Sequence, residues 1–446
     1  MARPRQRHPP NLPAGRADSA FRLGVLVQSH TFARGALACA LAAAVGTLWP
    51  TAPADAAGPG TLILVGGALA DTDTAVYQEI IAKAGGSTAK IGVITAASIP
   101  ESQDPDAGTD KASNSVANGA YYSALLKKYG AADAQWIPVD LDHVDAADSQ
   151  TVVDQINGMS GFFFGGGDQS RLITTLLHGD AHTDTRALAA IRAKLGAGAM
   201  VAGSSAGTTI QNGRDMITGG ESYEAVRDGS STGAPSGRAL TYLSAGGFGF
   251  FDSDLLDTHF AVRGREGRLI RLAADTGHRR AFGIDEDTAL EVTGVGASTQ
   301  TMRVLGTHGV SIFDLRSAKT GSAQGEWSIS GVRWSYLTGG DRYDPSAWSV
   351  TPDAGKSPFI PYSQSAESPS DDIFDSPDSH GPGYTLTGVA LDLGESGRSS
   401  TTYGRTYEDN PTFAVDLTKK DGYQILATDN RHAVSFTDLT VDISAS

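Results

Sequence analysis

One serine of the chain lies in a pattern typical of catalytic nucleophiles. The string Gly203-Ser-Ser-Ala-Gly207 follows an apolar run at residues 199–202 and precedes a stretch compatible with a helix. In a Gly-x-Ser-x-Gly pattern the glycines permit a sharp turn from strand to helix, which leaves the serine hydroxyl accessible. The pattern therefore predicts Ser205 as a nucleophile and the Ala206 amide as an oxyanion donor. The alternative is an ordinary tight turn in a glycine-rich chain.

A serine nucleophile needs a general base, and His259 is the candidate. It ends the string Asp257-Thr-His, directly after an apolar approach at residues 250–256. A base at the carboxyl end of one strand can face a serine at the end of a neighbouring strand. The alternative for His259 is a histidine at the edge of the core, bonded to the main chain. The other histidines after residue 56 lie in polar or glycine-rich turns: His143, His178, His182, His278, His308, His380 and His432.

The base in turn needs an orienting carboxylate. Spacing alone does not choose among the acidic residues between Ser205 and His259, which are Asp215, Glu221, Glu224, Asp228, Asp252, Asp254 and Asp257.

The elements that must position these residues alternate between strand and helix. Short apolar strands between amphipathic helices predict an α/β fold with a parallel sheet covered on both faces, and ligands of such sheets bind at the carboxyl ends of the strands. The expected strands are residues 61–65, 90–95, 134–139, 161–164 and 199–202, and the expected helices are residues 75–84, 120–129, 152–156, 170–177 and 187–195.

The second half of the chain has a different pattern. After about residue 288 the helical periodicity stops and strand-like runs follow, which predicts a β-rich completion of a first domain at residues 57–355. Residues 356–383 are rich in Pro, Ser and acidic residues and are predicted to be a linker or surface loop. Residues 384–446 are predicted to be a β-rich C-terminal segment.

Residues 1–56 have the features of a signal peptide and leader. They carry six arginines against two aspartates, then an apolar run at residues 35–49 and an Ala54-x-Ala56 cleavage pattern. We expect a secreted, extracellular mature chain that begins near Ala57. The apolar run is shorter than the roughly 20 residues that a spanning helix needs, so no membrane insertion is expected after signal removal. Cys39, the only cysteine of the chain, lies inside this leader, so thiol chemistry is excluded from the mature protein.

The net charge of −15 argues against nucleic acid as a partner, because binding phosphates needs clustered Lys and Arg. Carboxylates and histidines do not gather at metal-ligand spacing, so neither a metal nor a cofactor is expected. The oligomeric state stays open, with a homodimer as one option.

Five strings, taken in order, resemble the cyanophycinases and their relatives among serine peptidases. They are Gly165-Gly-Gly-Asp-Gln169, Gly203-Ser-Ser-Ala-Gly207, Met216-Ile-Thr-Gly-Gly220, Asp257-Thr-His-Phe260 and Gly283-Ile-Asp-Glu-Asp-Thr-Ala289. The resemblance covers roughly residues 61–341 and implies a flavodoxin-like sheet related to class I glutamine amidotransferases. Residues 228–237 look like an insertion relative to that family.

The resemblance also implies roles for individual residues. It implies Ser205 as nucleophile, His259 as base and Glu224 as the acid, with Glu221 as runner-up, and the backbone of Gly167 and Asp168 as further oxyanion donors. The substrate contacts that it implies are Gln169, Asp257, Arg263, Arg265 and Arg268. In this interpretation the arginines pair with free carboxylates of the substrate and Asp257 receives an arginyl side chain.

The resemblance implies a polypeptide substrate, cyanophycin, which is a poly-aspartate with arginine on each β-carboxylate. The expected activity is therefore that of a serine-type exopeptidase, which hydrolyses cyanophycin to β-Asp-Arg dipeptides through an acyl-enzyme. The alternatives are another aspartyl or isoaspartyl peptidase of the same superfamily, an esterase, which should also carry a His-Gly-Gly-Gly-type loop, and a non-catalytic binding protein.

Overall fold

Five parallel strands form one side of a nine-stranded sheet, out to one of its edges. The computed structural model describes residues 59–366, 369–429 and 431–446, so the predicted leader at residues 1–56 lies outside the described residues. The parallel strands, in spatial order, are β1 (Thr61–Val65), β7 (Met200–Ser204), β4 (Gly161–Phe164), β2 (Lys90–Ile94) and β3 (Asp133–Trp136). The predicted α/β fold is confirmed.

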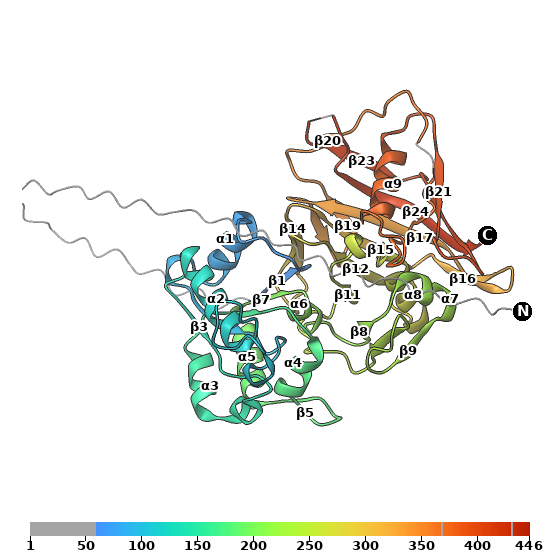
Figure 1. Cartoon of the computed structure of the whole chain (residues 1–446). Helices are drawn as coiled ribbons and strands as arrows, with labels where there is room; N and C mark the ends of the chain where they lie inside the picture. The colour runs from blue at the N-terminus through green and yellow to red at the C-terminus, as the bar shows by residue number, and fades with distance from the viewer. Residues whose placement is uncertain (1–58, 367–368, 430) are drawn as a thin grey trace, which may run out of the picture. The chain divides into compact units, whose positions relative to one another are not determined.

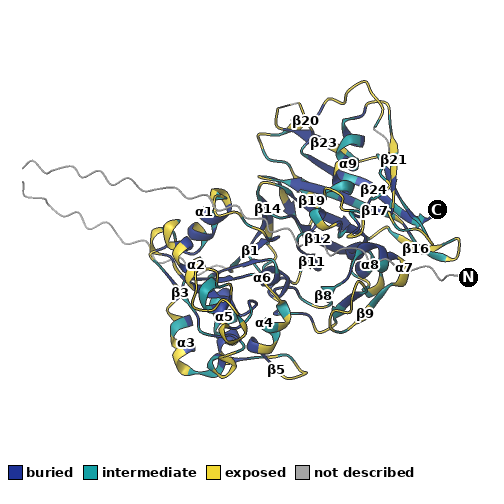
Figure 2. Ribbon diagram, in the orientation of Figure 1, coloured by how far each residue is buried: buried dark blue, intermediate teal, exposed yellow. Residues whose placement is uncertain are grey.

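Helices cover both faces of the parallel strands (Figure 1). Because side chains alternate along a strand, Ile63 and Val65 of β1 lie in one apolar cluster while Leu62 and Leu64 lie in another. The first cluster includes side chains of α1 (Thr74–Lys83) and α2 (Ser115–Lys128). The second includes side chains of α3 (Gln150–Asn157), α4 (Gln169–Leu176) and α5 (Arg186–Gly196). Figure 2 shows the resulting pattern, with buried strands and exposed outer helix surfaces.

The strands after residue 288 extend this sheet in the antiparallel sense. They are β13 (Thr288–Thr293), β14 (Thr301–Gly306), β18 (Arg342–Asp344) and β19 (Ser349–Thr351), and β13 pairs with β1. The sheet is therefore mixed, and the prediction of a parallel sheet holds for its first five strands.

A second, ten-stranded sheet includes the C-terminal segment. Its main path runs β11 (Leu255–Asp257), β12 (Arg280–Ile284), β15 (Gly309–Asp314), β17 (Glu326–Thr338), β24 (Ser435–Ala445), β22 (Phe413–Thr418) and β21 (Thr401–Arg405). The strands β16 (Lys319–Ala323), β20 (Ser357–Pro358) and β23 (Gln424–Ala427) pair beside it. Because β24 pairs with β17, the C-terminal segment shares a sheet with the region at residues 57–355.

Two parts of the C-terminal region differ from the sequence-based expectation. The segment predicted to be β-rich also contains a helix, α9 (Thr385–Glu395), whose Leu386 and Leu393 are buried. The acidic loop at residues 356–383 is anchored by Ile373 and Phe374, which are buried within the same apolar cluster as α9. Burial of these two apolar side chains favours contact between this polar stretch and the core.

The remaining elements are short and lie mostly around the candidate site. They are the strands β5 (Leu177–His178), β6 (Thr183–Asp184), β8 (Met216–Gly219), β9 (Ser230–Thr232) and β10 (Leu240–Leu243), and the helices α6 (Ala206–Thr209), α7 (Ser222–Asp228) and α8 (Glu266–Thr276). Short 3₁₀ turns occur at Gly86–Thr88, Glu101–Gln103, Val144–Asp148 and Ala261–Arg263. Within the described part of the chain, the helices are all too short or too polar to cross a membrane.

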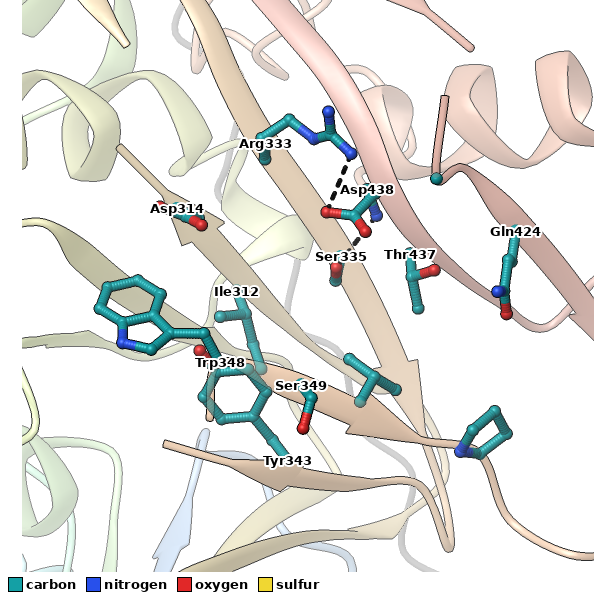
Figure 3. A pocket seen from close by; sticks show the side chains of 13 residues that line it. Ile312, Asp314, Arg333, Ser335, Tyr343, Trp348, Ser349, Gln424, Thr437 and Asp438 are labelled. Atoms are coloured by element: carbon teal, nitrogen blue, oxygen red, sulfur yellow. Dashed lines mark hydrogen bonds and ion pairs between the residues drawn. The ribbon is translucent and has the colours of Figure 1, made fainter. Parts of the chain in front are cut away.

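The two sheets enclose a polar cleft of about 230 Å³ (Figure 3). One wall comes from β18 and β19 of the first sheet and the other from β15, β17 and β24 of the second. Across this second wall, Arg333 Nη2 of β17 lies 3.2 Å from a carboxylate oxygen of Asp438 of β24. This ion pair spans two strands whose main chains already pair with each other.

Candidate active site

Ser205 lies at the turn between β7 and α6. Its backbone has φ 54° and ψ −118°, a strained conformation for a residue other than glycine. Gly207, two residues after the serine, is needed for steric reasons, because a Cβ built on it would lie 2.1 Å from the carbonyl oxygen of Phe164. The turn therefore depends on residues without side chains, as the Gly-x-Ser-x-Gly pattern predicts.

Ser205, His259 and Glu286 form a continuous chain of close contacts. Ser205 Oγ lies 2.7 Å from His259 Nε2, and His259 Nδ1 lies 2.6 Å from Glu286 Oε1. When Glu286 is ionised it accepts the proton of Nδ1, which leaves Nε2 as the acceptor for the serine hydroxyl. This arrangement can move a proton from Ser205 to His259.

Backbone contacts hold His259 in place beside the serine. Its N–H donates to the carbonyl oxygen of Gly66 at 2.8 Å. The imidazole packs directly on Gly67, where a Cβ would lie 2.3 Å from His259 Cε1, and Gly67 has φ +115°. The loop after β1 therefore forms one wall behind the histidine, and only glycine fits there.

The surroundings of His259 favour its neutral form. Burial lowers the pKa of the imidazole below its ordinary value, and the positive charges of Arg263 and Arg265 lower it further, although the hydrogen bond to Glu286 opposes them. A neutral imidazole is the form that can accept a proton.

The same shift gives an expected pH dependence. Because a lowered pKa keeps His259 neutral in more acidic solution, the acid limb of kcat/KM should lie below pH 6.5, the ordinary histidine value. Removing the positive charge in Arg263→Gln should raise the pKa of His259 and move this limb to higher pH. The profile is measured with a small activated ester. Arg227→Gln, which alters an arginine paired with Asp228, is the control and should leave the limb unchanged. An acid limb that moves to lower pH in Arg263→Gln would contradict the conclusion that Arg263 lowers the pKa of His259.

The serine and histidine open into a cavity of about 150 Å³. The structure brings most of the predicted site residues to its lining: Gly167, Gln169, Ser205, Ala206, Asp257, His259, Arg263, Arg265 and Arg268. The lining holds three arginines against one aspartate, so the cavity carries excess positive charge. Such a cavity favours a substrate with a free carboxylate near the scissile bond.

Comparison with known proteins bears on this geometry. The model of peptidase family S51 matches residues 110–300. A cyanophycinase of Synechococcus elongatus is 31% identical over 268 residues, which cover 59% of this chain and 71% of that protein. The chain belongs to the cyanophycinase family of serine peptidases.

Two further proteins are similar to part of the chain. A cyanophycinase of a Nostoc species is 32% identical over 190 residues, which cover 41% of this chain and 57% of that protein, so the match spans little more than half of that relative. Among solved structures, a peptidase from an acI-B1 Actinobacterium gives a TM-score of 0.38 with 19% identity, covering 58% of this chain and 91% of that chain.

The carboxylate beside His259 in this member of the cyanophycinase family is not the one expected. Glu224 lies on α7, where its carboxylate is 3.9 Å from Arg238, and Glu221 immediately precedes that helix. The contact of His259 Nδ1 is with Glu286, which corrects the expectation for Glu224. Glu286 follows both Ser205 and His259 in sequence, so it is not among the acidic residues between them. The signal was nonetheless present, since Glu286 lies in the fifth string of the family pattern.

One of the expected oxyanion donors is already occupied. The N–H of Asp168 donates to the carbonyl oxygen of Ala97 at 2.8 Å, so the Asp168 amide is not available to a substrate and that expectation is wrong. The N–H groups of Gly167 and Ala206 have no hydrogen-bond partner among the described residues and both line the cavity. These two amides can therefore receive a negatively charged oxygen.

The charged residues of the cavity divide into a structural pair and free groups. Asp257 accepts two hydrogen bonds from Arg268, from Nε at 2.8 Å and Nη2 at 2.7 Å, and Arg268 Nη1 also donates to the carbonyl oxygen of Gly220. Both side chains are almost fully buried. Although burial alone would raise the pKa of Asp257, Arg268 and Arg265 hold it below its ordinary value.

This pairing corrects two expected substrate contacts. Asp257 does not present a free carboxylate to an arginyl side chain, and Arg268 does not present a free guanidinium to a carboxylate. Arg265 is partly engaged, since its Nη1 donates to the carbonyl oxygen of Thr258 at 2.6 Å. Arg263 is exposed and makes no ion pair or side-chain hydrogen bond with any described residue. It is therefore the guanidinium most available to a substrate.

Removing the buried carboxylate should destabilise the fold. Asp257→Asn leaves the Arg268 guanidinium buried without its counter-charge, which should lower the free energy of unfolding by about 3–5 kcal/mol. Urea denaturation of the two chains measures this difference. Asp378→Asn, which breaks an exposed ion pair with Arg238, is the control and should leave the free energy of unfolding unchanged. Equal effects of both substitutions would contradict a structural role for Asp257.

Metal ligands do not gather in the described residues: no group of three or more His, Cys, Asp or Glu side chains there is placed to hold an ion.

Proposed function

We propose that the chain is a serine-type exopeptidase that hydrolyses cyanophycin to β-Asp-Arg dipeptides through an acyl-enzyme. The observation that carries the proposal is the chain of contacts from Ser205 through His259 to Glu286, which opens into a cavity beside the unpaired Arg263. The relatives that bear the name cyanophycinase support the choice of substrate.

The first half of the reaction forms the acyl-enzyme. Ser205 Oγ attacks an aspartyl carbonyl carbon of the polymer backbone while His259 Nε2 takes the hydroxyl proton. The carbonyl electron pair moves to the oxygen, which the amides of Gly167 and Ala206 stabilise. When the C–N bond breaks, His259 gives its proton to the leaving amine.

The second half releases the product by the same groups. Water attacks the acyl carbon as His259 takes one of its protons, and the proton returns to Ser205 Oγ when the ester bond breaks. Glu286 keeps the Nδ1 proton in place through both halves and stabilises the imidazolium that forms.

The charges of the cavity suit the free carboxylates of this polymer. Each arginine of the polymer is joined to the poly-aspartate through its amino group and therefore keeps a free carboxylate. The Arg263 guanidinium can donate two parallel hydrogen bonds to this carboxylate. Aspartyl and isoaspartyl peptides also carry a carboxylate near the scissile bond, so another peptidase activity of the same superfamily is the alternative.

We further propose that the enzyme acts outside the cell. The arginine-rich start, the apolar run and the small residues at Ala54 and Ala56 support export with cleavage near Ala57.

Incubation with the insoluble polymer tests the proposed activity. The chain should convert purified cyanophycin to β-Asp-Arg, identified by mass spectrometry, and the Ser205→Ala chain should release none. If only short aspartyl or isoaspartyl peptides are cleaved, the alternative holds. If no peptide bond is cleaved, the proposal is wrong.

The proposed role of Arg263 predicts a selective loss. Arg263→Ala should lower kcat/KM on the polymer about ten- to a hundredfold, because one charge-assisted hydrogen-bonding partner is lost, and should leave hydrolysis of a small activated ester nearly unchanged. Arg227→Ala, at an arginine outside the cavity, is the control. Equal losses on both substrates would mean that Arg263 has a structural role.

A further inference from the structure

A second cavity, of about 260 Å³, adjoins the catalytic one and shares Gln169 and Thr218 with it. It lies between the start of α4 and the end of β10, and its walls are mainly apolar: Ile173 of α4, Leu243 of β10 and Pro235 of the β9–β10 loop. The two cavities are therefore neighbours that have Gln169 and Thr218 in common.

The loop that completes the cavity is fixed to the catalytic region. Thr218 Oγ1 donates to the carbonyl oxygen of Gly233 at 2.9 Å and also lies 2.8 Å from Thr241 Oγ1. A Cβ built on Gly219 would lie 3.2 Å from Pro235 Cβ, so the proline packs directly on the strand that separates the two cavities. The residues 228–237, which look like an insertion in the sequence, thus form part of a built wall.

The charge at the rim of this cavity is negative. Asp168 is exposed there, forms no ion pair with a described residue, and uses one carboxylate oxygen to accept the N–H of Ser170 at 2.8 Å. Lys and Arg do not occur among the described residues that line the cavity. The remaining titratable side chain of the lining is His182.

We propose that this cavity is a subsite for a long cationic side chain, arginyl or lysyl, of the substrate residue next to the one held at Ser205. The methylene groups lie against Ile173, Pro235 and Leu243, and the terminal cation pairs with Asp168. An anionic side chain would meet the Asp168 carboxylate without a compensating base, and a purely apolar side chain would bring no positive charge to pair with it. The inference rests on the proposed peptidase function, and it assigns the position at which the enzyme would recognise the arginyl groups of its polymer.

Binding measurements on the inactive chain test the subsite separately from catalysis. In the Ser205→Ala background, calorimetry gives Kd for short aspartyl peptides whose neighbouring side chain is arginyl, lysyl, citrullyl or norleucyl. The arginyl and lysyl peptides should bind on the order of tenfold more tightly than the citrullyl and norleucyl peptides, because only the first two carry a cation.

Variants then locate the recognition. Asp168→Asn preserves the cap of α4, since asparagine caps helices as well as aspartate does, and it should abolish the preference for the cation. Asp180→Asn, at an exposed aspartate outside the lining, should keep the preference. Leu243→Ser should raise the Kd of the arginyl and citrullyl peptides alike, because it removes apolar wall contact that both side chains make.

The outcomes separate this inference from the proposed function. Equal affinity for arginyl and citrullyl peptides, an undiminished preference in Asp168→Asn, or no binding of any peptide would overturn the subsite. Cation-dependent binding that is lost in Asp168→Asn, together with a wild-type chain that leaves cyanophycin intact, would keep the subsite and reject the polymer as substrate.

Discussion

The Ser205→Ala chain should fold normally and lose about four to six orders of magnitude in kcat on peptide substrates. The substitution removes the hydroxyl that lies against His259 Nε2, so the acyl-enzyme cannot form, and the remaining rate comes from the oxyanion donors and substrate binding. Initial rates on the polymer and on a short aspartyl peptide measure the loss, and circular dichroism checks the fold.

The neighbouring serine provides a matched control. Ser204 ends β7 and is buried, so Ser204→Ala removes a hydroxyl one residue away without touching His259. It should retain activity within about tenfold of the unmodified chain. Near-normal activity of Ser205→Ala, or equal losses in both variants, would reject Ser205 as the nucleophile.

The second large effect should distinguish the two glutamates. Glu286→Gln should lower kcat about 10³- to 10⁴-fold, because a neutral amide no longer stabilises the imidazolium and can hold the histidine in the wrong tautomer. Glu224→Gln should retain kcat within about threefold, because Glu224 contacts Arg238 and not His259.

Glu221→Gln extends this comparison to the other carboxylate expected from sequence. It precedes α7 and makes no contact with the imidazole, so its activity should match that of Glu224→Gln. A large loss of kcat in either of these two variants, together with an active Glu286→Gln chain, would show that the substituted glutamate, and not Glu286, is the acid of the triad.

Local sequence patterns were sufficient for the first half of the fold. The strands β1 and β4 have the bounds that the apolar runs predict, and the helices α1, α4 and α5 begin and end within a few residues of their predicted positions. Each of these elements buries its own apolar residues, so its periodicity is visible in its own sequence. The helix α9 was missed because it lies in a segment whose surrounding residues are strand-like.

The identity of the triad acid depended on tertiary structure. β11 pairs in parallel with β12, so their carboxyl ends lie side by side. His259 follows the last residue of β11 by two positions, and Glu286 follows the last residue of β12 by two positions. Their contact comes from this pairing, and a separation of 27 positions along the chain conceals it from any argument based on spacing.

The sequence by itself determined the turn that presents Ser205, the histidine that faces it and the parallel strands of the first sheet, because these depend on short-range patterns of glycine and apolar residues. The strand before His259, β11, lies in the second sheet and not beside β7. Only the tertiary structure decided which charged groups are free. Asp257 and Arg268 neutralise each other because two elements bring them together in a buried position, whereas Arg263, five residues before Arg268, is exposed at the cavity. Pairing and burial are properties of contacts between distant segments, and the order of residues along the chain does not contain them.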